Sequence, residues 1–127
     1  MINIHRFVDE LPRKQRFYDK SKFLSYELAR LSASKFLEDP SLLERGREFM
    51  ERHMRPDPCQ AEYYEIWSDL LRRDPQEIAR LLLSDTPDGD LLRDTMPVFY
   101  VPTYDERLSV LSRSRDGDCE IMNGYRA

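Results

Sequence analysis

Apolar residues recur at helical spacing through most of this chain. Leu24, Leu28 and Leu31 follow the i, i+4, i+7 spacing of one helix face, and the helix they predict begins near Lys20. It ends at Asp39, because a residue that precedes proline is pushed out of the α region. Further stripes follow, carried by Leu42, Leu43, Phe49 and Met50, then by Tyr63, Tyr64, Trp67, Leu70 and Leu71, then by Ile78, Leu81 and Leu82, and last by Leu108 and Leu111.

Helix-start signals precede these stripes. Ser41 and Thr103 each open a Ser/Thr-x-x-Glu capping box, in which the hydroxyl and the Glu carboxylate satisfy free backbone amides. Asp57 and Asp74 each precede a proline, so that the Asp caps a helix whose first residue is proline. Residues 86–89, Thr-Pro-Asp-Gly, have the composition of a turn.

These signals predict an all-α fold, a single compact domain of five to six short helices. The scarcity of glycine, only 4 residues, also disfavours β-sandwich and dinucleotide-binding folds. We expect a basic N-terminal arm over residues 1–18, the helical domain over 19–111 and a flexible tail over 112–127. An apolar segment bracketed by Pro97 and Pro102, residues 98–102, is expected to be extended between the last two helices.

The charge is unevenly distributed. The first 22 residues carry six Lys or Arg against three Asp or Glu, whereas the whole chain has a net charge of -4. The acidic remainder argues against broad nonspecific DNA binding, which depends on neutralising phosphates. It suits a basic protein partner, because complementary potentials steer encounter. The alternative is that the acidity only keeps the protein soluble.

Membrane insertion and secretion are not expected. No run approaches the roughly 18 apolar residues that span a bilayer, and the first residues lack a signal-peptide pattern. Cys59 and Cys119 lie in unlike contexts and are predicted to be two free thiols in the cytoplasm, and a disulfide between them is the alternative. The sequence is compatible with a monomer and with a homo-oligomer.

No catalytic motif or cofactor-binding motif is present. His5 and His53 belong to no cluster with zinc-ligand spacing, and no nucleophile elbow or glycine-rich phosphate loop occurs. The aspartates around Gly89 do not match a calcium loop, because Pro87 interrupts it and Met96 stands where the last ligand belongs. We therefore expect a non-enzymatic protein without metal or cofactor.

Residues 96–104, together with Arg107 of the last helix, are the candidate partner-binding region. They hold more aromatic and apolar residues than a connection needs, and such residues are enriched at the centres of interfaces. The alternative is that the segment closes the bottom of the bundle. The candidate contact residues are Met96, Phe99, Tyr100, Tyr104 and Arg107.

A second candidate surface would bind nucleic acid. The arm interleaves basic and aromatic residues, which pair with phosphates and stack on bases. The alternative, which we favour, is that the arm lies on the acidic body of its own chain. The candidate nucleic-acid contacts are Arg6, Arg13, Lys14, Arg16, Arg72, Arg73 and Arg80.

Six short runs, in a fixed order, give the chain a family resemblance over about residues 25–111. They are residues 39–45, 64–71, 75–82, 91–93, 96–99 and 104–107. In this order they resemble small bacterial helical proteins that act as antitoxins or antitoxin-like partners of a neighbouring toxin. Met96-Pro97 stands where such proteins commonly have Ser-Pro, and the following Val98–Val101 run also departs from the pattern.

The resemblance implies a non-enzymatic inhibitor that occludes the active site of a cognate toxin by direct contact. In that interpretation Phe99, Tyr100 and Tyr104 insert as anchors and Arg107 pairs with a carboxylate of the partner. The alternatives are a DNA-binding transcriptional regulator that uses the arm with Arg72, Arg73 and Arg80, or an adaptor subunit of a larger assembly.

Overall fold

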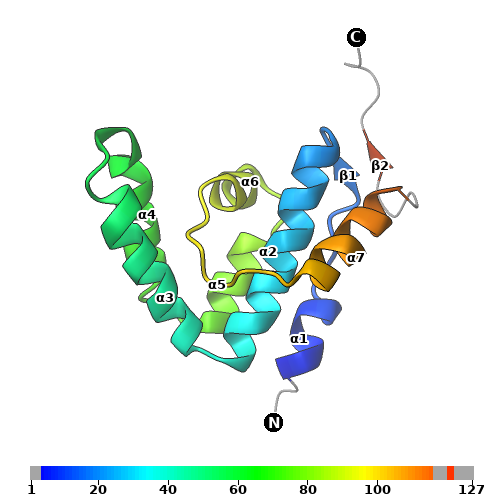
Figure 1. Ribbon diagram of the computed structural model, residues 1–127, viewed down its shortest axis with the longest axis horizontal. Helices are drawn as coiled ribbons and strands as arrows, with labels where there is room; N and C mark the ends of the chain where they lie inside the picture. Colours follow the sequence, from blue (N-terminus) through cyan, green and yellow to red (C-terminus); the bar gives the residue numbers. More distant parts are fainter. Residues whose placement is uncertain (1–3, 116–119, 122–127) are drawn as a thin grey trace.

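A computed structural model describes residues 4–115 and 120–121, with side chains described over residues 7–113. Within this part the chain is an all-α domain, as predicted (Figure 1). Its helices are α1 Ile4–Glu10, α2 Lys20–Glu38, α3 Ser41–Phe49, α4 Ala61–Leu70, α5 Pro75–Leu82, α6 Pro87–Asp94 and α7 Tyr104–Arg115. A π-helical turn, Met50–Met54, extends α3, and a 3-10 turn, Pro58–Gln60, precedes α4.

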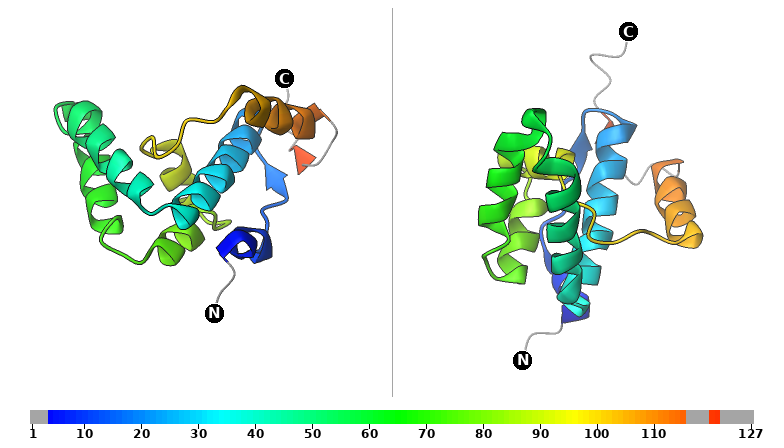
Figure 2. Two further views of the ribbon diagram at one scale, coloured as in Figure 1. Left: turned by 60° about the horizontal axis from the view of Figure 1, so that its bottom comes forward. Right: turned by 60° about the vertical axis from the view of Figure 1, so that its left-hand side comes forward.

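The longest helix, α2, is the centre of the domain. It contacts α1, α3, α5, α6 and α7, which are arranged around it (Figures 1 and 2). The carboxylate of Asp19 caps its first turn by accepting from the Lys22 amide at 2.9 Å. The helix ends before Asp39-Pro40, as predicted.

The buried side of α2 is not the leucine stripe that defined the helix in the sequence. Phe23, Tyr26 and Phe36 are fully buried, together with small residues that let neighbouring helices approach. Leu24 and Leu28 are half-buried and line a groove beside α7. The helix therefore has two apolar sides, one for the core and one nearer the surface.

An Asp-Pro pair precedes each of three helical segments, at residues 39–40, 57–58 and 74–75. Asp57 and Asp74 accept from the amides two residues later, as predicted, at 2.9 and 2.8 Å. The capping box predicted at Ser41 is wrong in its detail. Asp39 reaches the Ser41 amide first, at 3.2 Å, so Ser41 lies inside the first turn and its hydroxyl donates to Asp39.

The prediction of a turn at residues 86–89 is also wrong, because these residues begin helix α6. The Thr86 hydroxyl accepts from the Gly89 amide at 3.0 Å, and Pro87 occupies the first helical position. Proline there loses no hydrogen bond, since the first amides of a helix have no partner within it.

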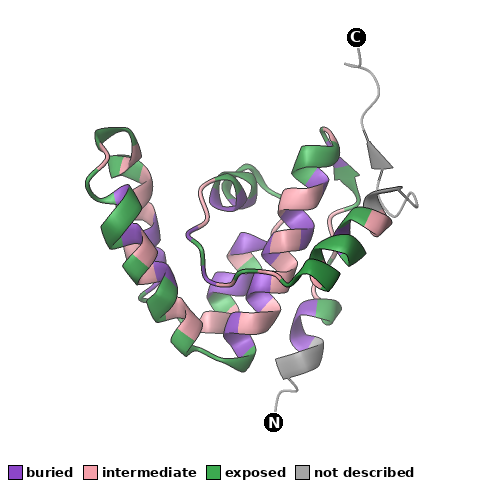
Figure 3. Cartoon of the chain, in the orientation of Figure 1, coloured by how far each residue is buried: buried purple, intermediate pink, exposed green. Residues whose placement is uncertain are grey.

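The core lies where the α3–α4 hairpin meets α2. Phe99, from the segment between α6 and α7, packs against Phe36 and Trp67 with ring centroids 5.5 and 5.7 Å apart. Buried positions therefore concentrate on the inner sides of α2, α4 and α5, whereas α7 is mostly exposed (Figure 3). Helix α7 lies on the other side of α2 from the α3–α4 hairpin (Figure 2).

Both ends of the described chain pack on the body. Phe7 and Val8 of α1 are buried against α2, and Phe17 is buried beside Phe23. The two-residue strand β1, Arg16–Phe17, pairs in parallel with β2, Glu120–Ile121. Helix α7 continues beyond residue 111, where the sequence predicted the tail to begin; the rest of that predicted tail, residues 116–119 and 122–127, lies outside the described residues.

Within the described residues, no helix combines the length and the apolar character needed to cross a membrane.

Candidate partner-binding surface

Phe99 cannot act as the exposed anchor that the sequence suggested. Its side chain is fully buried, in contact with Phe36 and Trp67 and directly against Gly46. An aromatic ring in an extended segment fills the space between the hairpin and α2, and burying it there stabilises the fold more than exposure would. Phe99 is therefore a core residue, and its buried side chain is not accessible to a partner.

Met96 and Tyr100 are also engaged within the chain. Met96 is half-buried against the core. The Tyr100 hydroxyl donates to a carboxylate oxygen of Glu106 at 2.6 Å, and the Lys35 ammonium lies over the Tyr100 ring, 5.2 Å from its centroid. These contacts fix the first turn of α7 and leave little of either side chain for a partner.

The capping box predicted at Thr103 is confirmed, and Glu106 is its second member. The Thr103 amide donates to Glu106 at 2.9 Å, and the Glu106 amide donates back to the Thr103 hydroxyl at 3.2 Å. Hydrogen bonds from the Thr103 amide and then the Tyr100 hydroxyl lower the pKa of Glu106. The bond to this carboxylate raises the pKa of Tyr100. The start of α7 is thus firmly defined.

Tyr104 and Arg107, the other two predicted contacts, are exposed on α7. Tyr104 is 75% exposed and begins an apolar row along the outer side of the helix. The row, here called the α7 row, consists of Tyr104, Leu108 (41% exposed) and Leu111 (43%). Large apolar side chains exposed together are typical of an interaction surface.

The helical spacing of these residues could be seen in the sequence, but not which side of the helix would face solvent. Leu108 and Leu111 are predicted as the apolar residues of the last helix, whereas Tyr104 is predicted as a partner contact. In the structure Val110 is the α7 residue that is buried against α2. The side chains at 104, 108 and 111 consequently lie on the outer face.

An open groove runs beside the row, between α2 and α7. Its volume is about 290 Å³, near the lower end of the range for ligand pockets, and its walls are mostly aliphatic. Within the described residues no carboxylate pairs with Arg107, which lies at its edge. The groove, here called the α2–α7 groove, is lined by Leu24, Leu28, Pro102, Arg107, Val110 and Leu111.

A buried carboxylate fastens α7 to the rest of the chain. Glu27 of α2 is 2% exposed and pairs with Arg113 of α7 at 2.9 Å. It also pairs with Arg13, from the segment before β1, and lies 3.9 Å from Arg30. This cluster could not be predicted from local patterns, because Arg13 and Arg113 are far from Glu27 along the chain.

The predicted nucleic-acid contacts are partly neutralised within the chain. Lys14 pairs with Asp85 at 2.6 Å and Arg13 pairs with Glu27, as expected for an arm that lies on its own acidic body. Arg73 pairs with Glu77 at 3.0 Å, and the Arg80 guanidinium covers the Phe7 ring. Arg16 and Arg72 are exposed, and the Arg6 side chain lies outside the described residues.

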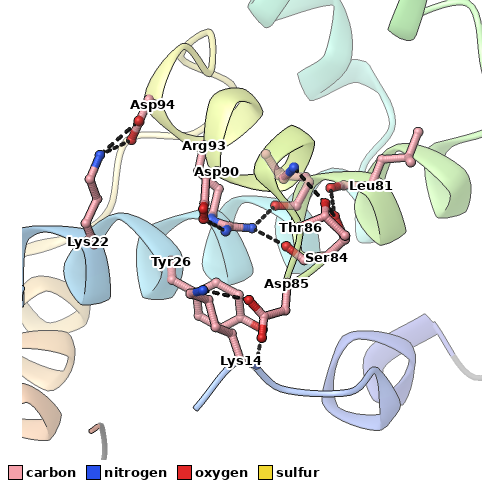
Figure 4. A network of polar contacts seen from close by, with 12 residues as sticks. Lys14, Lys22, Tyr26, Leu81, Ser84, Asp85, Thr86, Asp90, Arg93 and Asp94 are labelled. Atoms are coloured by element: carbon pink, nitrogen blue, oxygen red, sulfur yellow. Dashed lines mark hydrogen bonds and ion pairs between the residues drawn. The ribbon is translucent and has the colours of Figure 1, made fainter. Parts of the chain in front are cut away.

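Three of the four aspartates around Gly89, predicted to form a solvated turn, belong to an ordered network: Asp85, Asp90 and Asp94 (Figure 4). Arg93 is buried and donates to the carbonyl oxygens of Leu82 and Ser84 at 2.8 and 2.9 Å, and to Asp90. Its guanidinium also covers the Tyr26 ring. This arginine, which no sequence signal singled out, joins α6 to the end of α5 and to α2.

Two lysines complete this attachment of α6. Asp85, just before the helix, pairs with Lys14, and Asp94, at its end, pairs with Lys22 at 2.9 Å (Figure 4). The hydrogen bond to Asp94 raises the pKa of Lys22. Helix α6 is therefore held at both ends and in its middle.

Among the described residues no group of three or more His, Cys, Asp or Glu side chains is arranged to hold a metal ion. Cys59 is exposed and not in a disulfide, and Cys119 lies outside the described residues. Comparison of the chain with protein-family models, curated proteins and solved structures found no match.

Proposed function

We propose that this protein is a non-enzymatic binding protein that contacts a protein partner through the α7 row and the α2–α7 groove. The observation that carries the proposal is the α7 row itself, an exposed apolar stripe next to Arg107, an arginine without an ion-pair partner among the described residues. Burying that stripe against a partner removes apolar surface from water, the main favourable term in protein association.

The groove suggests the chemistry of the contacting segment. An aliphatic or aromatic side chain of the partner enters between α2 and α7, where Leu28 and Val110 form the walls. A carboxylate of the partner, placed beside that side chain, pairs with Arg107. An arginine at the edge of an apolar groove supplies both specificity and a charge-assisted hydrogen bond.

The resemblance to antitoxin-like proteins makes a cognate toxin the first partner to test. In that form of the proposal the protein acts in the bacterial cytoplasm and inhibits the toxin by direct contact. The DNA-binding alternative is less favoured, because Arg13 and Lys14 of the arm are already paired with acids of the same chain.

The decisive experiment isolates the partner with the tagged full chain and then measures its affinity by calorimetry for four variants. Leu108→Ser and Arg107→Glu change the proposed surface. Val98→Ser, with 38% exposure against 41% for Leu108, and Arg52→Glu, an exposed arginine on another helix, are the matched controls.

We expect the two surface variants to weaken binding by about tenfold or more, as central interface residues do, while the controls bind as the parent does. Equal affinity for all five proteins would overturn the assignment of the surface. The toxin form of the proposal requires, in addition, that the partner alone arrests growth and that co-expression of this protein restores it.

A further inference from the structure

We propose a second binding site, independent of the α7 row, in the groove between α4, α5 and α6. Its ligand is a basic segment of a protein partner that presents an apolar side chain flanked by lysine or arginine. The proposal adds a site and a ligand class to the proposed function and does not depend on it. Here the site is called the α4–α6 groove.

The shape of this groove suits a side chain of a partner. It has a volume of about 370 Å³ and is open to solvent along one side. Leu91, 36% exposed, forms part of its edge. The aliphatic residues that line it are Ile66, Leu70, Leu81, Leu91 and Leu92.

The charge at its edge is negative. Asp69 and Asp88 line the groove, are exposed and have no ion-pair partner among the described residues. Arg73 also lines it, but its guanidinium is paired with Glu77 at 3.0 Å, so its charge is offset locally. The uncompensated charge at the groove therefore comes from two carboxylates.

The contrast with the other aspartates near α6 makes Asp88 distinctive. Asp85, Asp90 and Asp94 are each paired with a basic residue of the chain and help to hold the helix (Figure 4). Asp88 has no such structural task in the described contacts. Its position in the first turn of α6 is one where the helix dipole favours a negative charge.

The walls of the groove are fixed before any ligand binds. Arg93 ties α6 to the Leu82 and Ser84 carbonyls, and the Thr86 cap sets where the helix begins. A preformed groove spares the ordering cost that would otherwise oppose binding. A rigid apolar groove edged by two carboxylates is complementary to an apolar side chain that lies between two basic ones. The α2–α7 groove has the opposite charge at its edge, because Arg107 lies there.

These two grooves together give the chain two docking sites of opposite charge on different elements. The basic ligand assigned to the α4–α6 groove also matches the acidic balance of the chain outside its N-terminal arm. If both grooves are occupied at once, the protein joins two segments of unlike charge, which is the behaviour of an adaptor.

The test uses the full chain with labelled methyl groups and two synthetic amphipathic peptides of about 14 residues, long enough to form a helix when bound. One peptide is built from leucine and lysine, and the other from leucine and glutamate. A third peptide, with serine in place of leucine in the lysine series, measures attraction by charge alone. Methyl shifts of Leu81, Leu91 and Leu92 report the α4–α6 groove, and those of Leu28 and Leu111 report the α2–α7 groove.

We expect the leucine–lysine peptide to shift the first set of methyl groups with saturable binding. Replacing both groove aspartates, Asp69→Lys with Asp88→Lys, should weaken that binding by roughly tenfold, because like charges would then face each other. A control with the same change of charge, Glu48→Lys with Asp105→Lys, and the variant Leu108→Ser should bind the peptide nearly as the parent does.

Three results would overturn the proposal. They are shifts in the α2–α7 groove instead, shifts spread over the surface without saturation, or equal binding of the serine peptide. Because the readout is local to the α4–α6 groove, its failure leaves the proposed function of the α7 row standing, and the failure of that function leaves this site standing.

Discussion

Phe99 and Gly46 are in direct contact, and the Phe99 ring occupies the space into which a side chain at residue 46 would project. The glycine lies within α3, where it lowers helix stability relative to alanine. The ring that covers it is fully buried and also touches Phe36 and Trp67. The absence of a side chain at position 46 is therefore what lets the segment before α7 close the core.

Replacing Gly46 by alanine should destabilise the fold, although alanine is the better helix former. The added methyl group would collide with the Phe99 ring, and overpacking of this kind costs about 1–3 kcal/mol. The helix-propensity gain offsets at most about 1 kcal/mol of that loss. Urea unfolding followed by circular dichroism would measure the difference in free energy of unfolding.

The same substitution in a Phe99→Leu background serves as its control. With the ring gone, the alanine methyl group has room, so Gly46→Ala should cost much less there than in the parent. Equal costs in the two backgrounds would mean that the contact with Phe99 is not the cause.

A second prediction concerns Arg93, whose guanidinium donates to two carbonyl oxygens and to Asp90. Lysine keeps the charge but cannot place donors in the planar arrangement of a guanidinium. Arg93→Lys should therefore lower the free energy of unfolding by about 2 kcal/mol, through buried carbonyl groups left without donors. Thermal unfolding would detect it, and Arg52→Lys, at an exposed position, should leave the melting temperature unchanged.

The fold class and most helix boundaries follow from the sequence because they depend on local chemistry. Asp74 before Pro75 starts a helix whatever lies around it, and Asp39 before Pro40 ends one. The prediction of a turn near Gly89 was wrong, and the reason also lies in the local sequence. The composition of a turn and that of a capped, proline-led first helical turn are the same, and here the helix continues to Asp94.

The orientation of side chains could not be predicted in the same way. Phe99 lies in an extended segment without regular alternation, so only the position of α3 and α4 determines that it points inward. Leu108 and Leu111 have the spacing of a core stripe, yet α7 is packed on one side only and buries Val110 instead. Glu27 is buried beside Arg30 of its own helix and between Arg13 and Arg113, and no local pattern predicts those two distant partners.

That arginine cluster gives a third prediction. Glu27→Gln keeps the shape of the side chain but leaves Arg13 and Arg113 without their buried counter-charge. We expect a loss of about 3 kcal/mol in the free energy of unfolding, as when one member of a buried pair is removed. Arg113→Gln should cost less, since that side chain is 39% exposed.

The double variant distinguishes the cluster from an unrelated effect of the glutamine. If the two residues act through their ion pair, Glu27→Gln with Arg113→Gln should destabilise the protein by less than the sum of the single changes. Additive costs would contradict the pairing. Limited proteolysis should also cleave the single Glu27→Gln variant sooner near α7, because that helix loses one of its attachments to α2.

The last prediction is a dependence of stability on pH that arises at the start of α7. The Thr103 amide and the Tyr100 hydroxyl bind the ionised form of Glu106, so its pKa is lower in the folded protein than in the unfolded chain. A carboxyl group whose pKa is lowered by folding adds stability above its ordinary pKa, and that stability is lost as the pH falls through the lowered value.

Glu106→Gln should therefore reduce the free energy of unfolding by about 1 kcal/mol at neutral pH, as loss of a helix cap does, and by less in acid. Urea unfolding of both proteins from about pH 7 to about pH 3 would measure the difference. Glu48→Gln, an exposed glutamate outside any capping box, should show no such trend, and a Glu106→Gln deficit that stays constant with pH would mean that the carboxylate charge is not what stabilises this turn.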